Sequence, residues 1–220
     1  MTTRVFRAGE IIPFIPKERT AARPEPVWGV SEIAGRLVEL SSLGASATLT
    51  AAFGLVLDAQ RAGQPVVWVN SSGSAGSSAS TFFPPDAAEG GVDLDTLGVV
   101  RAADPPAAAR SAEKLVRSGA FGLVVIDLGS SLGPVAGSSR PFIPAPLLTR
   151  LVGLAQKHNT AVVFLTEKAA DSPSLASLVS LRAEARRVDG ASFEIRILKD
   201  KRRGPGRVHR EIFRGPAGLP

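Results

Sequence analysis

Cysteine is absent from this sequence, which excludes disulfide bonds and the disulfide-rich class of small secreted proteins. The apolar run near the start, residues 11–15, is far too short to span a membrane. A charged segment followed by an apolar one, the pattern of a secretory signal, does not open the chain. We therefore expect a cytoplasmic protein that does not contact a membrane.

Patterns for metal binding and nucleophilic catalysis are missing as well. The two histidines, His158 and His209, lie far apart in the sequence and have no cysteine near them, so no metal site is expected. Residues 73–76 (GSAG) are typical of a flexible loop and not of a catalytic serine on a sharp turn. No acid/base pair is recognisable. We predict no catalytic, cofactor-binding or metal-binding residues.

Net positive charge is absent from most of the chain and is concentrated at its end. Residues 1–181 carry 15 lysines and arginines against 15 acidic residues, whereas residues 182–220 carry 11 against 5. The net charge of +6 therefore lies in the second segment. A localised basic end is typical of contact with a polyanion or with an acidic partner surface. A solvated basic tail is the open alternative.

Apolar segments and helical segments alternate from Gly29 onward, with no internal repeat. Continuous apolar strands separated by helices are typical of a parallel sheet covered on both faces. At the end of the chain three strands follow one another without helices, and residues 204–206 (GPG) supply a turn, which predicts an antiparallel extension. The predicted fold class is therefore α/β. Strands are predicted at residues 37–40, 65–70, 97–101, 121–127, 161–166, 181–188, 193–199 and 208–213, and helices at 46–62, 105–118 and 147–158.

Three regions are predicted along the chain. Residues 1–27 form a proline-rich arm, residues 28–200 a core, and residues 201–220 a basic segment that ends the sheet. Four prolines within the arm exclude a long helix there. We expect the arm to pack on its own core, because an exposed apolar run invites aggregation; contact with a partner is the open alternative.

Several segments together resemble the RecA recombinase core in order and approximate spacing. They are residues 35–40 (GRLVEL), 91–97 (GVDLDTL), 117–127 (RSGAFGLVVID) and 195–201 (IRILKDK). No single segment is specific, but the set covers roughly residues 28–214. The resemblance implies a RecA-like core with a phosphate-binding loop after its first strand.

That loop lacks the groups that hold a nucleotide. A working loop needs glycines, a lysine on the β- and γ-phosphates and a hydroxyl on Mg²⁺. In gapless alignment Thr48 replaces the lysine and Leu49 the hydroxyl, and no lysine or arginine lies between Arg36 and Arg61. Helix-dipole attraction alone is worth about 1 kcal/mol or less at an exposed site. We therefore predict no nucleotide cofactor at a degenerate phosphate loop comprising Ser42, Gly44, Ala47, Thr48 and Leu49.

Other positions implied by the resemblance agree. Asp127 matches the magnesium-associated aspartate and is predicted to be a relic of that site, which lacks its partner loop. Ser72 falls near the position at which RecA proteins carry the glutamate that activates water, and a serine cannot serve as a comparable base. Glu167 stands at the position of their sensor glutamine. The loops at residues 129–145 and 168–180, which match the DNA-binding loops of RecA, lack a basic and aromatic surface. Filament-style strand exchange is not expected.

The basic end supplies the predicted contact with a partner or with DNA. Lys199 and Lys201 match residues that reach a neighbouring subunit's nucleotide in RecA filaments, and here an electrostatic contact to a partner is the better interpretation. Arg182 belongs to the same basic region, in which DNA binding would be sequence-blind and sensitive to salt. The predicted contact residues are Arg186, Arg187, Arg196, Lys199, Lys201, Arg202, Arg203, Arg207 and Arg210.

With its degenerate loop the chain is most similar to the ImuA group, RecA-like accessory proteins of the bacterial mutagenic translesion-synthesis cassette. SulA-like proteins are a weaker match. The ImuA resemblance implies a non-catalytic adaptor of the SOS response to DNA damage, associated with the nucleoid when DNA is damaged. Its implied partners are an ImuB-type polymerase-like protein and RecA. A sequence-independent DNA-binding recombination mediator, a SulA-like regulator with no DNA role and a residual ATPase remain open alternatives.

Overall fold

The computed structural model describes residues 28–44, 46–71, 84–128, 143–190 and 192–212. The predicted arm, Ser72, the loop at residues 73–76 and most of the first predicted DNA-binding loop lie outside the described residues. Within them, one sheet has the strand order β3-β2-β4-β5-β1-β6-β7-β8. The strands are β1 (Leu37–Ser42), β2 (Val66–Ser71), β3 (Leu97–Ala102), β4 (Leu123–Asp127), β5 (Ala161–Glu167), β6 (Leu181–Arg187), β7 (Ser192–Asp200) and β8 (Val208–Ile212).

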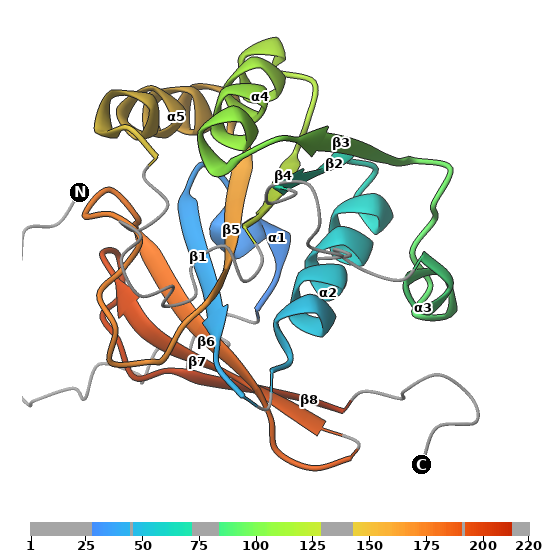
Figure 1. Ribbon diagram of the computed structural model, residues 1–220. Coiled ribbons are helices and arrows are strands. Elements are labelled where there is room, and N and C mark those ends of the chain that lie inside the picture. Colours follow the sequence, from blue (N-terminus) through green and yellow to red (C-terminus); the bar gives the residue numbers. More distant parts are fainter. Residues whose placement is uncertain (1–27, 45, 72–83, 129–142, 191, 213–220) are drawn as a thin grey trace, which may run out of the picture.

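Helices cover both faces of this sheet (Figure 1). The helices α1 (Val30–Ile33) and α2 (Thr48–Arg61) pack on one face, where Trp68 of β2 is fully buried and stacks on Phe53 at 5.0 Å. The helices α4 (Pro105–Ser118) and α5 (Ala145–His158) pack on the other face. A short helix, α3 (Pro84–Glu89), precedes β3. The predicted α/β class, a mostly parallel sheet flanked by helices, is confirmed.

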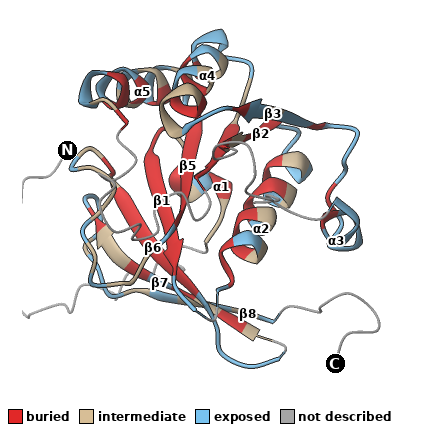
Figure 2. Ribbon diagram, viewed as in Figure 1, coloured by how far each residue is buried: buried red, intermediate tan, exposed pale blue. Residues whose placement is uncertain are grey.

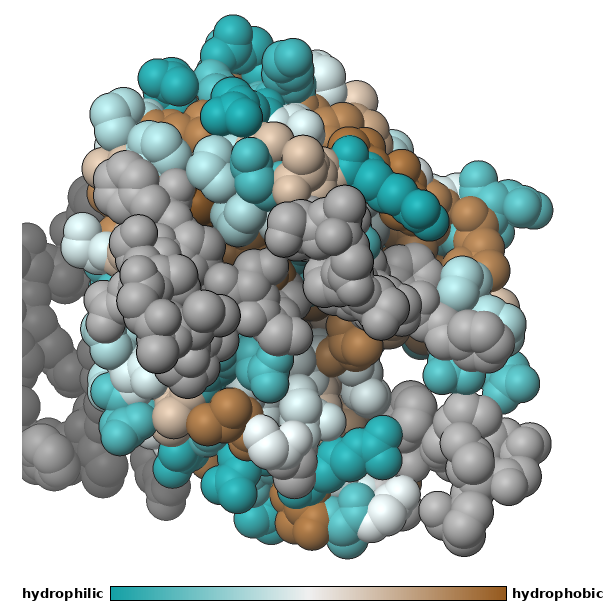
Figure 3. Space-filling view, in the orientation of Figure 1, coloured by the Kyte–Doolittle hydropathy of each residue, from teal (hydrophilic) through white to brown (hydrophobic). Residues whose placement is uncertain are grey.

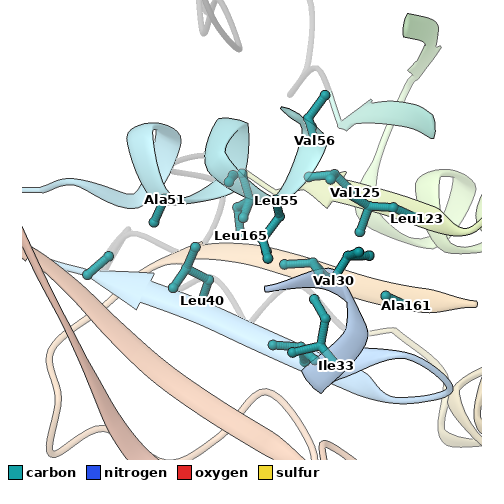
Figure 4. Packing of buried hydrophobic residues seen from close by; sticks show 14 of the residues in the cluster. Val30, Ile33, Leu40, Ala51, Leu55, Val56, Leu123, Val125, Ala161 and Leu165 are labelled. Carbon is teal, nitrogen blue, oxygen red and sulfur yellow. The ribbon is translucent and has the colours of Figure 1, made fainter. Parts of the chain in front are cut away.

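The central strands are apolar on both sides, which is the reason they read as continuous apolar runs in the sequence. Figure 2 shows β1, β4 and β5 as almost wholly buried, whereas β3 at the sheet edge is largely exposed. Figure 4 shows the α1–α2 side of this core, in which Val30, Leu40 and Leu55 meet between the helices and the sheet. Over the opposite helices, α4 and α5, hydrophilic residues predominate at the surface (Figure 3).

Local signals explain where the helices begin and end. Asp104 caps α4 by accepting a hydrogen bond from the Ala107 amide at 2.6 Å, and Pro105 starts the helix, which ends at Gly119 with φ of 70°. The helix predicted from residue 46 begins two residues later. The backbone of Ser46 forms an isolated bridge with Arg186 of β6, and its hydroxyl accepts a hydrogen bond from the Thr48 amide at 3.2 Å. The short helices α1 and α3 were not predicted.

The C-terminal strands extend the sheet as predicted, with one refinement. Strand β6 pairs in parallel with β1 and antiparallel with β7, so the antiparallel part begins at β7. Gly204 and Gly206, with φ of 79° and 96°, form the turn to β8, in the left-handed region that favours glycine. None of the helices in the described part of the chain has the length and apolar character needed to cross a membrane.

Candidate functional site

The degenerate phosphate loop lies where a RecA-like core would hold phosphate, between the carboxyl end of β1 and the start of α2. Ser42 ends β1 and is buried, and its carbonyl accepts a hydrogen bond from the Lys168 amide at 3.1 Å. Gly44 has a φ of 80°. Thr48 and Leu49 begin α2, and the Leu49 side chain is 41% exposed. The loop therefore presents a threonine and a leucine in its first helical turn.

Three successive backbone amides of this loop already have partners inside the protein. The Ser46 amide donates to the Gly44 carbonyl at 2.7 Å, the Ala47 amide to the Ala185 carbonyl at 3.2 Å, and the Thr48 amide to the Ser46 hydroxyl. A phosphate at a helix N-terminus is held by amides that point at the ligand. These three amides could serve a phosphate only after their internal hydrogen bonds were broken.

The fold brings two arginines of β6 near this loop, which inspection of the loop sequence did not reveal. Arg186 forms the backbone bridge with Ser46, and Arg187 lines a small cavity together with Ala47 and Thr50. Both arginines are exposed. Only the placement of β6 beside β1 puts these cations close to α2, and a sequence contains no local signal for that neighbour relation.

The predicted relic residue Asp127 ends β4 and is buried, with 5% of its surface exposed. Strand β4 lies between β2 and β5, and Asp127 is in register with Asn70 and Leu165. Glu167, at the sensor position, ends β5 and is exposed. The relic role of Asp127 stays a prediction.

A buried carboxylate on β1 organises the segment between β5 and β6. The side chain of Glu39 is fully buried and accepts hydrogen bonds from the Thr166 hydroxyl at 3.0 Å and the Leu175 amide at 2.8 Å. The Lys168 ammonium lies 2.5 Å from one carboxylate oxygen, and the Arg182 Nε lies 3.9 Å from the other. A charge buried in a sheet requires such partners. A glutamate within a strand predicted to be buried was therefore the one sequence signal that a buried ionic cluster exists here.

The same segment is held from several directions. The Arg182 guanidinium donates to the carbonyls of Ala169, at 2.7 Å, and Ser172. Leu175 and Leu178 pack against the core on the α4–α5 side. Residues 168–180, predicted to match a DNA-binding loop, are thus tied to the sheet through a buried ionic cluster of Glu39, Lys168 and Arg182.

A second buried carboxylate, Asp200, joins the end of β7 to the start of β1. Its fully buried side chain accepts from Arg36 at 2.6 Å, from the Arg202 amide at 2.8 Å and from Arg207. Burial by itself raises the pKa of Asp200, but the hydrogen bond from the Arg202 amide and the charges of Arg36 and Arg207 outweigh it, so the pKa is lowered. Arg36 also donates to the Ser180 carbonyl at 3.0 Å.

The predicted contact residues divide into paired and exposed groups. Arg196 pairs with Glu184 at 2.9 Å, and Arg210 with Glu194 at 2.9 Å. Arg203 pairs with Glu32, and Arg207 with Asp200. The Lys201 ammonium donates to the Ser177 carbonyl at 2.8 Å. The members that are exposed and form no ion pair among the described residues are Arg186, Arg187, Lys201 and Arg202.

Lys199 lies half-buried near the end of β7. Its pKa is lowered, chiefly because burial desolvates the ammonium and next because Lys201 is also a cation. Four of the nine predicted contact residues therefore lie in ion pairs within the protein, and the role of the set in binding stays a prediction. No cluster of three or more histidine or acidic side chains suited to a metal ion occurs in the described residues, and His209 lies 2.8 Å from Glu211.

Comparison with known proteins identifies RecA proteins as relatives. The RecA of Chloroflexus aurantiacus is 27% identical over 199 residues, which cover 76% of this chain and 55% of the relative. The RecA of Caulobacter vibrioides is 31% identical over 143 residues, or 60% of this chain and 38% of the relative. The RecA of Nocardioides sp. is 31% identical over 144 residues, or 60% and 39%.

The chain thus spans about half, or less, of the length of the RecA proteins it matches. No protein-family model matches it. The partial match to RecA proteins is consistent with the fold, in which helices cover both faces of a mostly parallel sheet and the degenerate loop follows the first strand. Together these observations support a relationship between this chain and the RecA-like superfamily.

Proposed function

We propose that this chain is a non-catalytic RecA-like adaptor in SOS-induced, error-prone translesion synthesis. It binds an ImuB-type polymerase-like protein, RecA or both, and it neither binds nor hydrolyses a nucleotide. The observation that carries the non-catalytic part is the internal pairing of the amides of Ser46, Ala47 and Thr48. The loop also lacks the lysine and the hydroxyl ligand that a triphosphate with its metal requires.

The adaptor part is supported by the relationship to RecA proteins and by the ImuA resemblance. A RecA-like core without nucleotide chemistry retains its sheet, its helices and their exposed surfaces. Exposed arginines occur at both ends of β6: Arg186 and Arg187 end the strand, and Arg202 and Arg203 of the β7–β8 turn lie beside its start. Each pair offers a basic surface on the extension. Such a surface suits an acidic partner, because charge complementarity steers association and fixes its register.

Titration with Mg·ATP tests the non-catalytic part. We expect no heat of binding in calorimetry and no shift in the unfolding temperature, because three loop amides already have internal partners and the first helical turn holds no cation. A RecA protein under the same conditions provides the positive control. Saturable binding with a dissociation constant below about 1 mM, a standard free energy of about −4 kcal/mol, would contradict the proposal.

Co-purification tests the adaptor part. The wild-type chain is expected to retain an ImuB-type protein, RecA filaments or both. Combined replacement of Lys201, Arg202 and Arg203 by alanine is expected to weaken retention about tenfold, since exposed charges act mainly on association. The control variant replaces Arg101, Arg110 and Lys114 by alanine, which are exposed cations on β3 and α4. Absence of both partners from the wild-type complex would reject the adaptor role.

The β7–β8 turn also favours a second candidate, a sequence-independent DNA-binding mediator. Lys201, Arg202 and Arg203 are consecutive exposed cations that can contact phosphates. The discriminating measurement is the affinity for single-stranded DNA over a salt series, since phosphate contacts weaken steeply with salt. A lack of binding at low salt would reject the mediator and leave the adaptor in place.

A further inference from the structure

Strand β8 ends the sheet, and its outer side has no strand partner among the described residues. Its inner side pairs with β7, with Glu194 opposite Arg210 and Arg196 opposite Val208. Alternate backbone N–H and C=O groups of an edge strand point away from the sheet, where they can pair with another extended segment. The backbone of β8 can therefore accept one more strand.

The side chains on one face of β8 form a short pattern. Because successive side chains alternate between faces, Val208, Arg210 and Ile212 share a face. Val208 is 45% exposed and Ile212 is 86% exposed, the highest value among the large apolar residues described. The pattern is an arginine flanked on both sides by an exposed apolar residue.

Arg210 has donors left for a second partner. Its Nε donates to Glu194 at 2.9 Å, and the side chain is still 74% exposed. Among the described residues, its two terminal nitrogens have no hydrogen-bond partner. A guanidinium can bind a second carboxylate through such a pair of N–H groups.

A second copy of the chain fits this edge poorly. Antiparallel pairing of β8 with itself about a two-fold axis at Arg210 would place Val208 opposite Ile212, which is favourable. The same pairing would place Arg210 opposite Arg210, and like charges directly opposite one another destabilise a strand pair. The central arginine therefore disfavours self-association and selects a strand of opposite charge.

We propose that β8 binds an extended segment of a partner protein that carries an acidic residue between two apolar residues, each separated by one position. The carboxylate faces Arg210, and the apolar residues cover Val208 and Ile212. The pattern reads the same in both directions, so either strand orientation satisfies it. This inference rests on the proposed adaptor function and names the surface and the chemistry through which the adaptor would bind.

Two synthetic peptides test the proposal with the whole 220-residue chain. One reads isoleucine-threonine-glutamate-threonine-valine at its centre, and the other has lysine in place of glutamate. Titration followed by amide NMR shifts and hydrogen exchange is expected to show protection of β8. The lysine peptide is expected to bind about tenfold more weakly, because an opposite-charge pair becomes a like-charge pair.

A charge-swapped variant makes the test specific. The double change Glu194→Arg with Arg210→Glu keeps an opposite-charge pair between β7 and β8 but reverses the charge at the edge. We expect it to prefer the lysine peptide. Ile212→Glu is expected to weaken the binding of both peptides. Val99→Glu, on the edge strand β3 at the other side of the sheet, should leave the binding of both unchanged. Unfolding curves of each variant check that the fold is kept.

Several results would overturn the proposal. The first is equal binding of the two peptides, and the second is no binding of either. The third is protection of the β8 amides in the absence of peptide, which would mean that a second copy or another part of the chain occupies the edge. Co-purification separates this inference from the adaptor role. A partner retained equally by the wild type and by Ile212→Glu rejects the edge and keeps the adaptor, whereas no retained partner rejects the adaptor.

Discussion

Replacement of Glu39 by alanine is expected to lower the free energy of unfolding by about 3–5 kcal/mol, because it leaves buried cations without their carboxylate. Lys168 is 15% exposed and Arg182 is 5% exposed, so water cannot take over the role of Glu39. Urea denaturation at neutral pH measures the change. Hydrogen exchange of residues 168–180 should rise in the same variant, because the Leu175 amide loses its acceptor.

The control for this prediction is Glu194→Ala. Glu194 also pairs with an arginine, but its partner Arg210 is largely exposed, so the expected cost is at most about 1 kcal/mol. Glu39→Gln, which keeps the shape and an acceptor, should lie between the two and remain measurable if the alanine variant does not fold. A loss below about 1 kcal/mol for Glu39→Ala would show that the buried cluster contributes no more than a surface pair.

The second large effect is expected at Asp200. Replacement of Asp200 by alanine removes the ionic partner of Arg36, which is only 4% exposed. The Arg202 amide also loses its hydrogen-bond acceptor. We expect a loss of about 3 kcal/mol, for the same reason of an uncompensated buried charge. Glu32→Ala, which breaks a pair with the half-exposed Arg203, should cost at most about 1 kcal/mol in the same denaturation experiment.

The direction of the Asp200 shift also predicts a pH dependence. Because the pKa of Asp200 is lowered in the folded protein, its ionised form is favoured by folding. The stabilisation is complete above the unfolded pKa of about 3.9 and is lost as pH falls through the lower folded pKa. In urea denaturation at a series of pH values, Asp200→Asn should lose less stability than wild type in that acidic window. Equal slopes would exclude Asp200 as the responsible group.

Much of the fold could be predicted from the sequence, because its signals are local. The helix at residues 105–118 was predicted with the observed bounds, since Asp104, Pro105 and Gly119 mark both ends. The apolar strands β4 and β5 were equally clear. The start of α2 was placed two residues early, because the bridge between Ser46 and β6 is a contact between distant segments. The parallel pairing of β6 with β1 likewise depends on sheet order.

The candidate site was predictable only in part. The missing lysine and hydroxyl at Thr48 and Leu49 are visible in the sequence, and the structure places both residues at the start of α2. One of the internal partners of the loop amides, the Ala185 carbonyl, comes from β6 and could not be foreseen. For the same reason the ionic partners of Glu39 and Asp200 could not be foreseen, since Lys168, Arg182 and Arg36 come from distant segments. Ionic partners across a sheet leave no spacing pattern in a sequence.

The position of β1 has a consequence for synthesis of the chain. Among the strands of the described residues, β1 is made first, yet its neighbours β5 and β6 end at residues 167 and 187. Residues 37–42 therefore wait without a strand partner while well over half of the polypeptide is translated. Because such long-range pairing must come late, the nascent chain exposes an apolar segment to chaperones and to other nascent chains until β5 leaves the ribosome.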